Sequence, residues 1–183
     1  MAGREGTRAP GALELVRTFV NSRDVEARTD ELLDLDSWRA WSGALRADVS
    51  GPATMADLRR LRRLREQLRT GLLANHDHAP LPASVTTELD SAMRWSRATT
   101  RFGPEGLDVV PAGDGPRRLV GMLLAGVATA FDDDTWKRLK ACGADDCRWA
   151  FYDTSRSGAG QWCSMAICGN RAKQAAWRAR HHS

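Results

Sequence analysis

All four cysteines of this chain lie within one 27-residue window near its C-terminal end. They form two pairs with the same internal spacing, Cys142-x4-Cys147 and Cys163-x4-Cys168, and 15 residues separate the pairs. Thiolates are preferred ligands of Zn2+, and four of them complete a closed tetrahedral shell. Two short-range pairs on two separate turns can deliver four sulfurs to one point. The spacing therefore predicts one structural zinc ion.

Three other interpretations of the cysteines meet objections. Two disulfides require an oxidising compartment, whereas the opening MAGREGTRAP lacks the apolar run of a secretory signal. Four unrelated buried thiols leave the symmetric pairing unexplained. A catalytic zinc needs an open coordination position, which four protein ligands do not provide. We expect structural zinc in a soluble, cytoplasmic protein, because the longest apolar stretch, residues 119–131, is also too short to span a membrane.

The segment between the pairs, RWAFYDTSRSGAGQW, has aromatic residues on either side of a Ser- and Gly-rich centre. This pattern predicts a hairpin with its turn near residues 157–160. A module with so few aliphatic residues cannot bury enough surface to stabilise itself, so metal binding would supply that free energy. Chelation is expected to unfold residues 140–175 before the rest.

The positive charge is concentrated beside the cysteines. Residues 137–183 carry nine Lys or Arg and three Asp, a net charge of +6, whereas the other 136 residues carry a net charge of −2. A basic block beside a near-neutral body is typical of a module that meets a polyanion. A solvated tail is the alternative explanation.

The last segment, GNRAKQAAWRARHH, predicts a helix with Asn170 as its N-cap. At about 100° per residue its alanines fall on one narrow face, opposite Gln174, Trp177 and His181. We expect that face to dock on the zinc-bound hairpin, which leaves an aromatic centre rimmed with cations. Such a surface suits nucleic acid. In the alternative arrangement, Trp177 packs on the N-terminal domain and the alanine face is exposed to water. The alanines of that face are Ala172, Ala175, Ala176 and Ala179.

Several of these motifs together resemble the CGNR zinc-finger family. The resemblance covers about residues 137–181 and rests on the first cysteine pair, on Trp162-Cys163-Ser164-Met165, and on Cys168-Gly169-Asn170-Arg171 followed by Lys173. In that family a treble-clef-like finger follows an N-terminal domain called ABATE, and the pair is regarded as a stress-responsive transcription regulator of bacteria. The opening LELVRTFVNSRD and the Asp36-Ser37-Trp38 segment are similar to the ABATE domain.

The resemblance implies one structural Zn2+ on the four cysteines and double-stranded DNA as the partner. Family members often carry basic residues just before the Trp-Cys pair, where this chain has Gly160 and Gln161. More of the contact then falls to Arg148, Arg156 and the last helix. A protein-interaction adaptor that uses the Trp177 surface without DNA is the rival hypothesis. The expected nucleic-acid contacts are Arg148, Arg156, Asn170, Arg171, Lys173, Gln174, Trp177, Arg178 and Arg180.

The chain as a whole is expected to be α+β. A mostly helical domain with a small hairpin would occupy residues 11–136, and the finger would occupy residues 137–183. The apolar run 13–20 is compatible with a helix or a strand, and residues 30–45 have helical spacing. Thr54 and Asp57 resemble a capping box that opens a long helix with a leucine stripe. The arginine run on its other face, residues 59–69, is interpreted as solvated.

The remainder of the first domain predicts a helix near residues 84–93, two strands near 95–102 and 107–110, and a buried helix after Pro116. The strands would be joined by the turn Gly103-Pro104-Glu105-Gly106. The two domains are expected to pack together, since no low-complexity linker separates them.

No catalytic motif is evident. The chain lacks a nucleophile elbow, a phosphate-cradling glycine loop, a dinucleotide fingerprint and a zincin helix. His76-x-His78 and the run Asp132-Asp133-Asp134 could hold a cation, but solvated loops and helix caps explain them as well. We expect a protein that is not an enzyme. A small-molecule effector of the N-terminal domain is compatible with the sequence, whereas an enzyme centred there would show a deep polar pocket.

Overall fold

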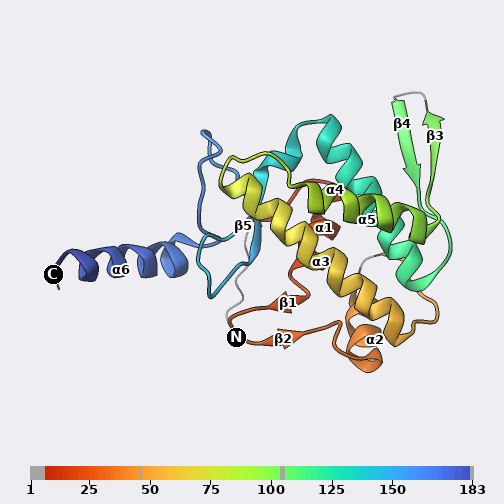
Figure 1. The fold of residues 1–183 in the computed structure, drawn as a ribbon, viewed down its shortest axis with the longest axis horizontal. Coiled ribbons are helices and arrows are strands. Elements are labelled where there is room, and N and C mark those ends of the chain that lie inside the picture. The colour runs from red at the N-terminus through yellow and green to blue at the C-terminus, as the bar shows by residue number, and fades with distance from the viewer. Residues whose placement is uncertain (1–6, 46, 104–105, 182–183) are drawn as a thin grey trace.

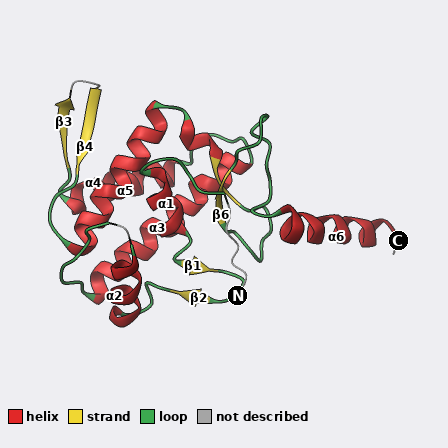
Figure 2. Ribbon diagram, turned by 180° about the vertical axis from the view of Figure 1, so that it is seen from behind, coloured by secondary structure: helices red, strands yellow, loops and turns green. Residues whose placement is uncertain are grey.

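The computed structural model describes residues 7–45, 47–103 and 106–181. Four helices pack around one core, a fifth lies at one end of the body and contributes Trp38 to that core, and the last helix extends away from it (Figures 1 and 2). The helices are α1 (Leu13–Val20), α2 (Leu35–Ala44), α3 (Met55–His76), α4 (Ala83–Ser96), α5 (Gly115–Asp132) and α6 (Asn170–His181).

The strands of the described residues form three separate antiparallel pairs. A 3-10 turn, Thr135–Arg138, leads into the last pair, and a π-helical turn, Met165–Gly169, leads into α6. The predicted α+β class is confirmed. The pairs are β1 (Arg23–Asp24) with β2 (Thr29–Asp30), β3 (Thr99–Gly103) with β4 (Gly106–Val110), and β5 (Leu139–Ala141) with β6 (Ala150–Tyr152).

Helix α3 begins where its sequence predicts. The side chain of Thr54 accepts a hydrogen bond from the backbone N–H of Asp57. The carboxylate of Asp57 in turn accepts one from the backbone N–H of Thr54, at 2.9 Å, and the two bonds together form a capping box. The leucine stripe faces the core, as its helical spacing requires. Its members are Leu58, Leu61, Leu64, Leu68 and Leu72.

The interpretation of the whole arginine run as solvated is wrong at two positions. Arg65 and Arg69 are buried, and they clamp the β1–β2 segment against α3. Arg65 contacts both carboxylate oxygens of Asp30, at 2.6 and 2.8 Å, and Arg69 donates to the carbonyl of Val20. Burial disfavours ionisation of Asp30, yet the hydrogen bond from Arg65 keeps the pKa of that carboxyl below its ordinary value.

Residues 13–20 form a helix, one of the two structures that the sequence allowed. One other boundary differs from the sequence prediction, because α4 continues through Trp95 and Ser96, where a strand was expected. Arg97 then adopts a left-handed conformation (φ 58°) that ends α4, so β3 starts only at Thr99. The β3–β4 hairpin is confirmed in register, and the Pro104-Glu105 part of its turn lies outside the described residues.

The β5–β6 hairpin belongs to the core of the body. Leu139, Ala141 and Ala150 are completely buried in the same cluster as the helices. Two asparagine amides fix its backbone: Asn21, next to α1, exchanges two hydrogen bonds with Ala150, and Asn75 of α3 donates to the carbonyl of Leu139. The expectation that the two parts of the chain pack together is confirmed.

The predicted hairpin with its turn at residues 157–160 does not form. The strand β6 pairs instead with β5, which precedes it in the chain. Residues 153–160 form a loop around a buried ion pair between Lys140 and Asp153 (3.0 Å). The ammonium of Lys140 also donates to the carbonyls of Gly158 and Gly160. Because the N–H of Gly160 donates to Asp153, it is not available to a strand ladder.

Candidate metal centre and the helix it carries

The four cysteine sulfurs lie together, all within 4.8 Å of one another. The sulfur of Cys163 is 3.6 Å from that of Cys147 and 3.7 Å from that of Cys168. A tetrahedron of thiolates around zinc, with bonds of about 2.3 Å, has sulfur–sulfur edges of about 3.8 Å. A disulfide would need about 2.05 Å, and all four cysteines are free thiols. The donor set therefore fits a tetrahedral metal ion and not a pair of disulfides.

Two turns on different elements deliver the sulfurs. The first pair sits at the tip of the β5–β6 hairpin, where Cys142 donates its N–H to Trp149 and the N–H of Cys147 bonds to Ala144. The second pair spans the π-helical turn, whose wide i→i+5 bond runs from the N–H of Gly169 to the carbonyl of Ser164. Gly143 donates to the carbonyl of Gln161 and so joins the two turns.

Three of the cysteines shift one another's pKa. Hydrogen bonds from Cys147 and Cys163 lower the pKa of Cys142 to about 2. The same contacts with Cys142 raise the pKa of Cys147 to about 12 and raise the pKa of Cys163 as well. The thiolate form is therefore favoured at Cys142 over Cys147 and Cys163, because the neighbouring thiols donate to it.

Comparisons with protein families agree with this geometry. Residues 138–181 match the family described as "CGNR zinc finger", and residues 10–133 match ABATE, described as "Putative stress-induced transcription regulator". The second match covers more than half of the chain. This chain belongs to the ABATE family and carries a CGNR zinc finger. No curated protein matches it. Neither matched family is an enzyme family by its description.

The terminal helix of the CGNR finger has none of its residues buried. It leaves the body at the metal cluster and extends into solvent (Figures 1 and 2). The expectation that its alanine face docks on the hairpin is wrong, because Ala175, Ala176 and Ala179 are exposed. The hairpin expected to receive that face does not form, and the β5–β6 hairpin found in its place packs against α1 and α3. The alternative is also wrong for Trp177, which is 53% exposed and stacks on His181 rather than on the N-terminal domain.

Asn170 is not the N-cap of this helix. Its backbone is helical (φ −68°, ψ −39°), and its side chain donates to the carbonyl of Ala166. The helix continues from the π-helical turn that holds Cys168, so no capping position exists at Asn170. The metal cluster and the projecting helix are therefore one continuous piece of backbone.

The arginine of the Cys-Gly-Asn-Arg motif contacts three separate parts of the protein. Its guanidinium lies 3.1 Å from Glu26, in the β1–β2 turn, and 3.1 Å from Asp146, between the first two cysteines. It also donates to the sulfur of Cys168 at 3.6 Å. Arg171 thus joins the start of α6 to the ABATE domain. No local pattern predicts this contact, because Glu26 and Arg171 are 145 positions apart.

The other expected nucleic-acid contacts divide between α6 and the loops. On α6, a shallow surface concavity is lined by Lys173, Gln174, Trp177, Arg178 and Arg180. Arg156 is exposed on the loop that follows β6. Arg148 is half-buried, in a left-handed conformation (φ 53°), and pairs with Asp145.

The other candidate metal ligands do not converge. Among the residues that the structure describes, the four cysteines are the one group of three or more ligating side chains close enough to share an ion. His76 contacts Asp77 through Nδ1, and its Nε2 faces the backbone of Gly143. At the end of α5, Asp133 accepts hydrogen bonds from Thr135 and Asp134 pairs with Lys137.

No helix of the described residues is long and apolar enough to cross a membrane.

Proposed function

We propose that this protein is a DNA-binding transcription regulator in which one structural Zn2+, held by Cys142, Cys147, Cys163 and Cys168, fixes the base of α6. The observation that carries the proposal is the exposure of α6 together with its composition: four basic residues, no acidic residue and no buried side chain. A helix of this length is only marginally stable alone in water. Its partner must therefore stabilise it and carry negative charge.

Double-stranded DNA meets both requirements. Its major groove admits an α-helix, and its phosphates attract Arg and Lys. In this proposal Lys173, Arg178 and Arg180 bind phosphates, and Gln174 and Trp177 contact bases. Arg148 and Asn170, which are next to or within two residues of a cysteine, and Arg156, on the exposed loop after β6, would contact the flanking backbone. The exact residues that touch DNA are part of the proposal.

We assign Arg171 a different role from the other basic residues. Its guanidinium is engaged by Glu26, Asp146 and Cys168. A donor to a metal-bound thiolate orients the ligand and stabilises its charge. Arg171 would thus set the direction in which α6 leaves the body, and any DNA contact would use its remaining exposed edge.

A duplex-selection assay on the zinc-loaded protein tests the proposal. We expect enrichment of a defined sequence, and binding that weakens steeply as salt rises because phosphate contacts release counterions. Replacing Lys173, Arg178 and Arg180 together by Gln should reduce the salt slope by about 2 to 3, with zinc content unchanged. A wild-type protein that selects no duplex would overturn the proposal.

The second candidate function is a zinc-dependent protein-interaction adaptor. It is favoured by the exposed alanine stripe and by Trp177, since small residues allow close helix contact and tryptophan is common at binding hot spots. An aromatic protein contact should respond little to salt. Selection of a defined duplex, with an affinity that falls steeply as salt rises, would favour DNA over a protein partner.

The ABATE domain also offers a place for a small effector. An open groove of about 480 Å3 lies between α1, the end of α2 and α5, and its lining includes Glu14, Leu15, Leu45 and Met122. Its lining is mostly apolar, as in most small-molecule sites. We propose that any effector of this domain is a largely apolar small molecule bound there.

A further inference from the structure

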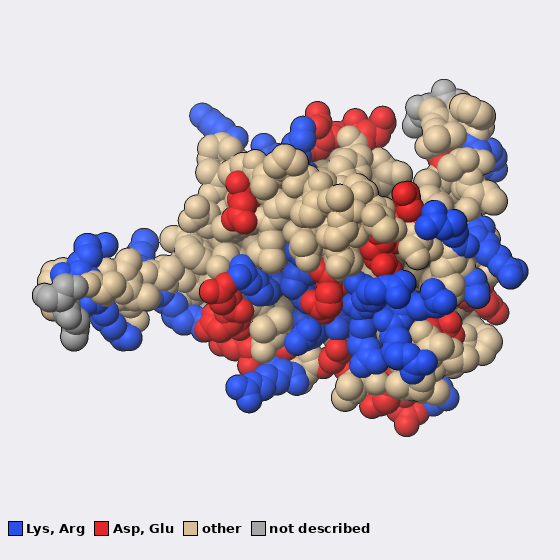
Figure 3. Space-filling model, in the orientation of Figure 1, with Lys and Arg blue, Asp and Glu red and all other residues tan. Residues whose placement is uncertain are grey.

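The six arginines of α3 divide into two groups with different surroundings. Arg65 and Arg69 are buried and paired with carboxylates. The other four lie within two turns of the helix and are exposed or half-exposed: Arg59, Arg60, Arg62 and Arg63. Figure 3 shows basic side chains gathered over the N-terminal half of α3. Although residues 1–136 have a net charge of −2, four of their basic side chains are concentrated on one part of α3.

Three of the four arginines form no ion pair within the described ranges. Arg63 donates to Glu88 at 2.8 Å, whereas Arg59, Arg60 and Arg62 have no described carboxylate at ion-pair distance, and Arg62 is only near enough to Asp30 to help lower its pKa. The other nearby carboxylates are already engaged, because Glu66 pairs with the two buried arginines and Asp57 belongs to the capping box. The positive charge of these arginines is therefore only partly neutralised by its surroundings.

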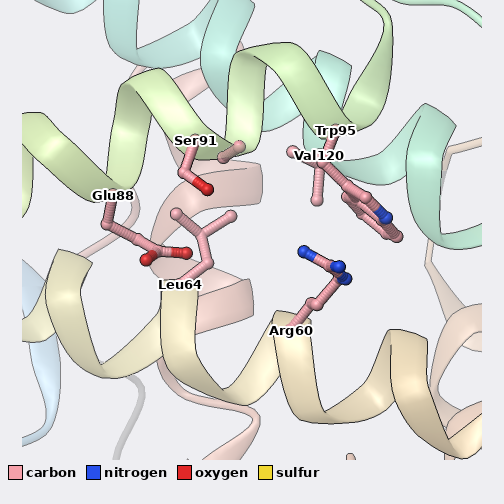
Figure 4. Close-up of a pocket in the computed structure, with 7 residues that line it drawn as sticks. Arg60, Leu64, Glu88, Ser91, Trp95 and Val120 are labelled. Atoms are coloured by element: carbon pink, nitrogen blue, oxygen red, sulfur yellow. The ribbon is translucent and has the colours of Figure 1, made fainter.

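Trp95, at the end of α4, contacts Arg60 and a second cation, Arg117. The guanidinium carbons of Arg60 and Arg117 lie 5.8 and 4.9 Å from the ring centroid of Trp95. Figure 4 shows Arg60 pointing into the shallow cleft between α3 and α4, beside Trp95 and across from Ser91. Cation–π contact holds the guanidinium in place, and two like charges near one ring favour a bound anion.

The leucines of α3 are not available to a protein partner at this surface. Leu58, Leu61 and Leu64, which alternate with the arginines, are at most 2% exposed. Protein interfaces obtain most of their affinity from buried aromatic and apolar anchors, whereas arginine pairs well with the oxygens of phosphates. Since Trp95 is partly buried and contacts two guanidinium groups, the charge of this surface matches a polyanion better than a protein partner.

We propose that Arg59, Arg60, Arg62 and Arg63 form a second DNA-binding surface, which contacts backbone phosphates of the same duplex class that α6 binds. This inference rests on the proposed function for its partner and extends binding to the ABATE domain. The surface supplies affinity without sequence preference, because phosphates carry no sequence information. Sequence readout stays with α6.

The test measures binding of the full, zinc-loaded chain to a random-sequence 30-base-pair duplex over a range of KCl concentrations. The variant Arg59→Gln, Arg60→Gln, Arg62→Gln removes the three unpaired cations from exposed positions. We expect the slope of log K against log salt to fall by about 2 to 3, and affinity at low salt to fall on the order of 10- to 100-fold. A matched variant, Arg101→Gln, Arg118→Gln, Lys137→Gln, makes the same charge change on β3, α5 and the turn before β5.

Four outcomes separate this proposal from the proposed function. Loss of slope in the α3 variant, with little change in the matched variant, supports it. Equal slopes in these two variants overturn it. If the α6 variant Lys173→Gln, Arg178→Gln, Arg180→Gln keeps its affinity while the α3 variant loses it, the role of α6 fails and the α3 surface stands. Loss of binding to poly-glutamate but not to duplex would assign the face to an acidic protein and overturn the proposal.

Discussion

At the scale of single residues, Arg171 joins three parts of the protein at one guanidinium. It contacts a cysteine of the metal cluster, the turn between the first two cysteines and the β1–β2 turn of the ABATE domain. Helix α6 has no buried residue beyond this point, so its direction depends on its first turn. A positioning role for Arg171 gives a different prediction from a phosphate contact.

Changing Glu26 to Gln tests that difference. Removing a negative charge should strengthen DNA binding if charge alone matters. If Glu26 holds Arg171, the change should instead weaken binding by about fivefold, since partly exposed ion pairs contribute about 1 kcal/mol or less. Fluorescence anisotropy with a selected duplex measures this, with Glu31→Gln as the control of equal charge. Tighter binding by the Glu26 variant would contradict the positioning role.

Changing Cys163 to Ser tests the metal ligands. Loss of one thiolate from a closed four-cysteine shell should abolish stoichiometric zinc, because the remaining set cannot complete the tetrahedron. Elemental analysis of the purified variant measures zinc per chain, with Ser164→Ala as the neighbouring control. One zinc per chain in the Cys163 variant would show that the ion is held elsewhere.

At the scale of elements, the β5–β6 hairpin lies in the core while the metal cluster at its tip connects it to α6. The hairpin is fixed by buried apolar residues and by the amides of Asn21 and Asn75. The π-helical turn and α6 have no such support. Stability in this module should therefore decline from the hairpin towards the C-terminal end.

Removing zinc from the full chain should reveal this gradient. A strong chelator is expected to abolish amide protection in residues 142–149 and 161–181, while β5, β6 and α3 keep theirs. The sequence alone predicts that residues 140–175 unfold before the rest. The structure changes this range, because β5 and β6 are buried in the core and α6 is not. Hydrogen exchange read by mass spectrometry provides the measurement. Equal loss of protection in β5 and α6 would mean that the hairpin also depends on the metal.

The loop after β6 depends on the ion pair between Lys140 and Asp153. Burial opposes ionisation of Asp153, but hydrogen bonds from Ser155, Lys140 and Gly160 lower its pKa to about 2, from an ordinary value of 3.8. A depressed carboxyl pKa contributes stability that is present above about pH 4 and is lost as pH falls towards 2.

Changing Lys140 to Met should leave the Asp153 carboxylate buried without its cation. At neutral pH the free energy of unfolding should fall by about 3 kcal/mol, and the difference from wild type should shrink as pH falls and Asp153 becomes protonated. Urea denaturation at several pH values measures this, with the exposed Lys137→Met as control. A loss that does not depend on pH would point to packing rather than charge.

At the scale of the whole molecule, the ABATE domain and the finger share one core. Leu139, Ala141 and Ala150 of the finger are buried in the same cluster as the leucines of α3. Among the described residues, basic side chains gather on α6 and over the N-terminal half of α3 (Figure 3). The finger therefore has its fold and its orientation set by the domain that precedes it.

A fragment of residues 137–183 should consequently be a poor zinc binder. Without α1 and α3 its hairpin lacks its buried contacts, and metal binding must then drive folding alone. We expect its zinc affinity to be at least about tenfold below that of the full chain, as measured by competition with a chromophoric chelator. Equal affinities would show that the finger folds independently.

The sequence by itself determined the features that depend on local spacing. The two cysteine pairs, the capping box of α3, its leucine stripe and the β3–β4 register follow from residue types a few positions apart. The helical tendency of the tail is likewise local, since Ala, Arg, Lys and Gln favour helix wherever they occur.

Tertiary structure alone decided the features that depend on distant partners. Nothing near Arg65 or Arg69 in the sequence separates them from Arg59 and Arg62, yet packing against the β1–β2 segment buries the first two. The alanine face stays exposed, and the hairpin on which it was expected to dock does not form because β6 pairs with β5. Arg171 meets Glu26 across 145 positions. Burial and ion pairing depend on which surfaces the fold brings together, and no local pattern records that.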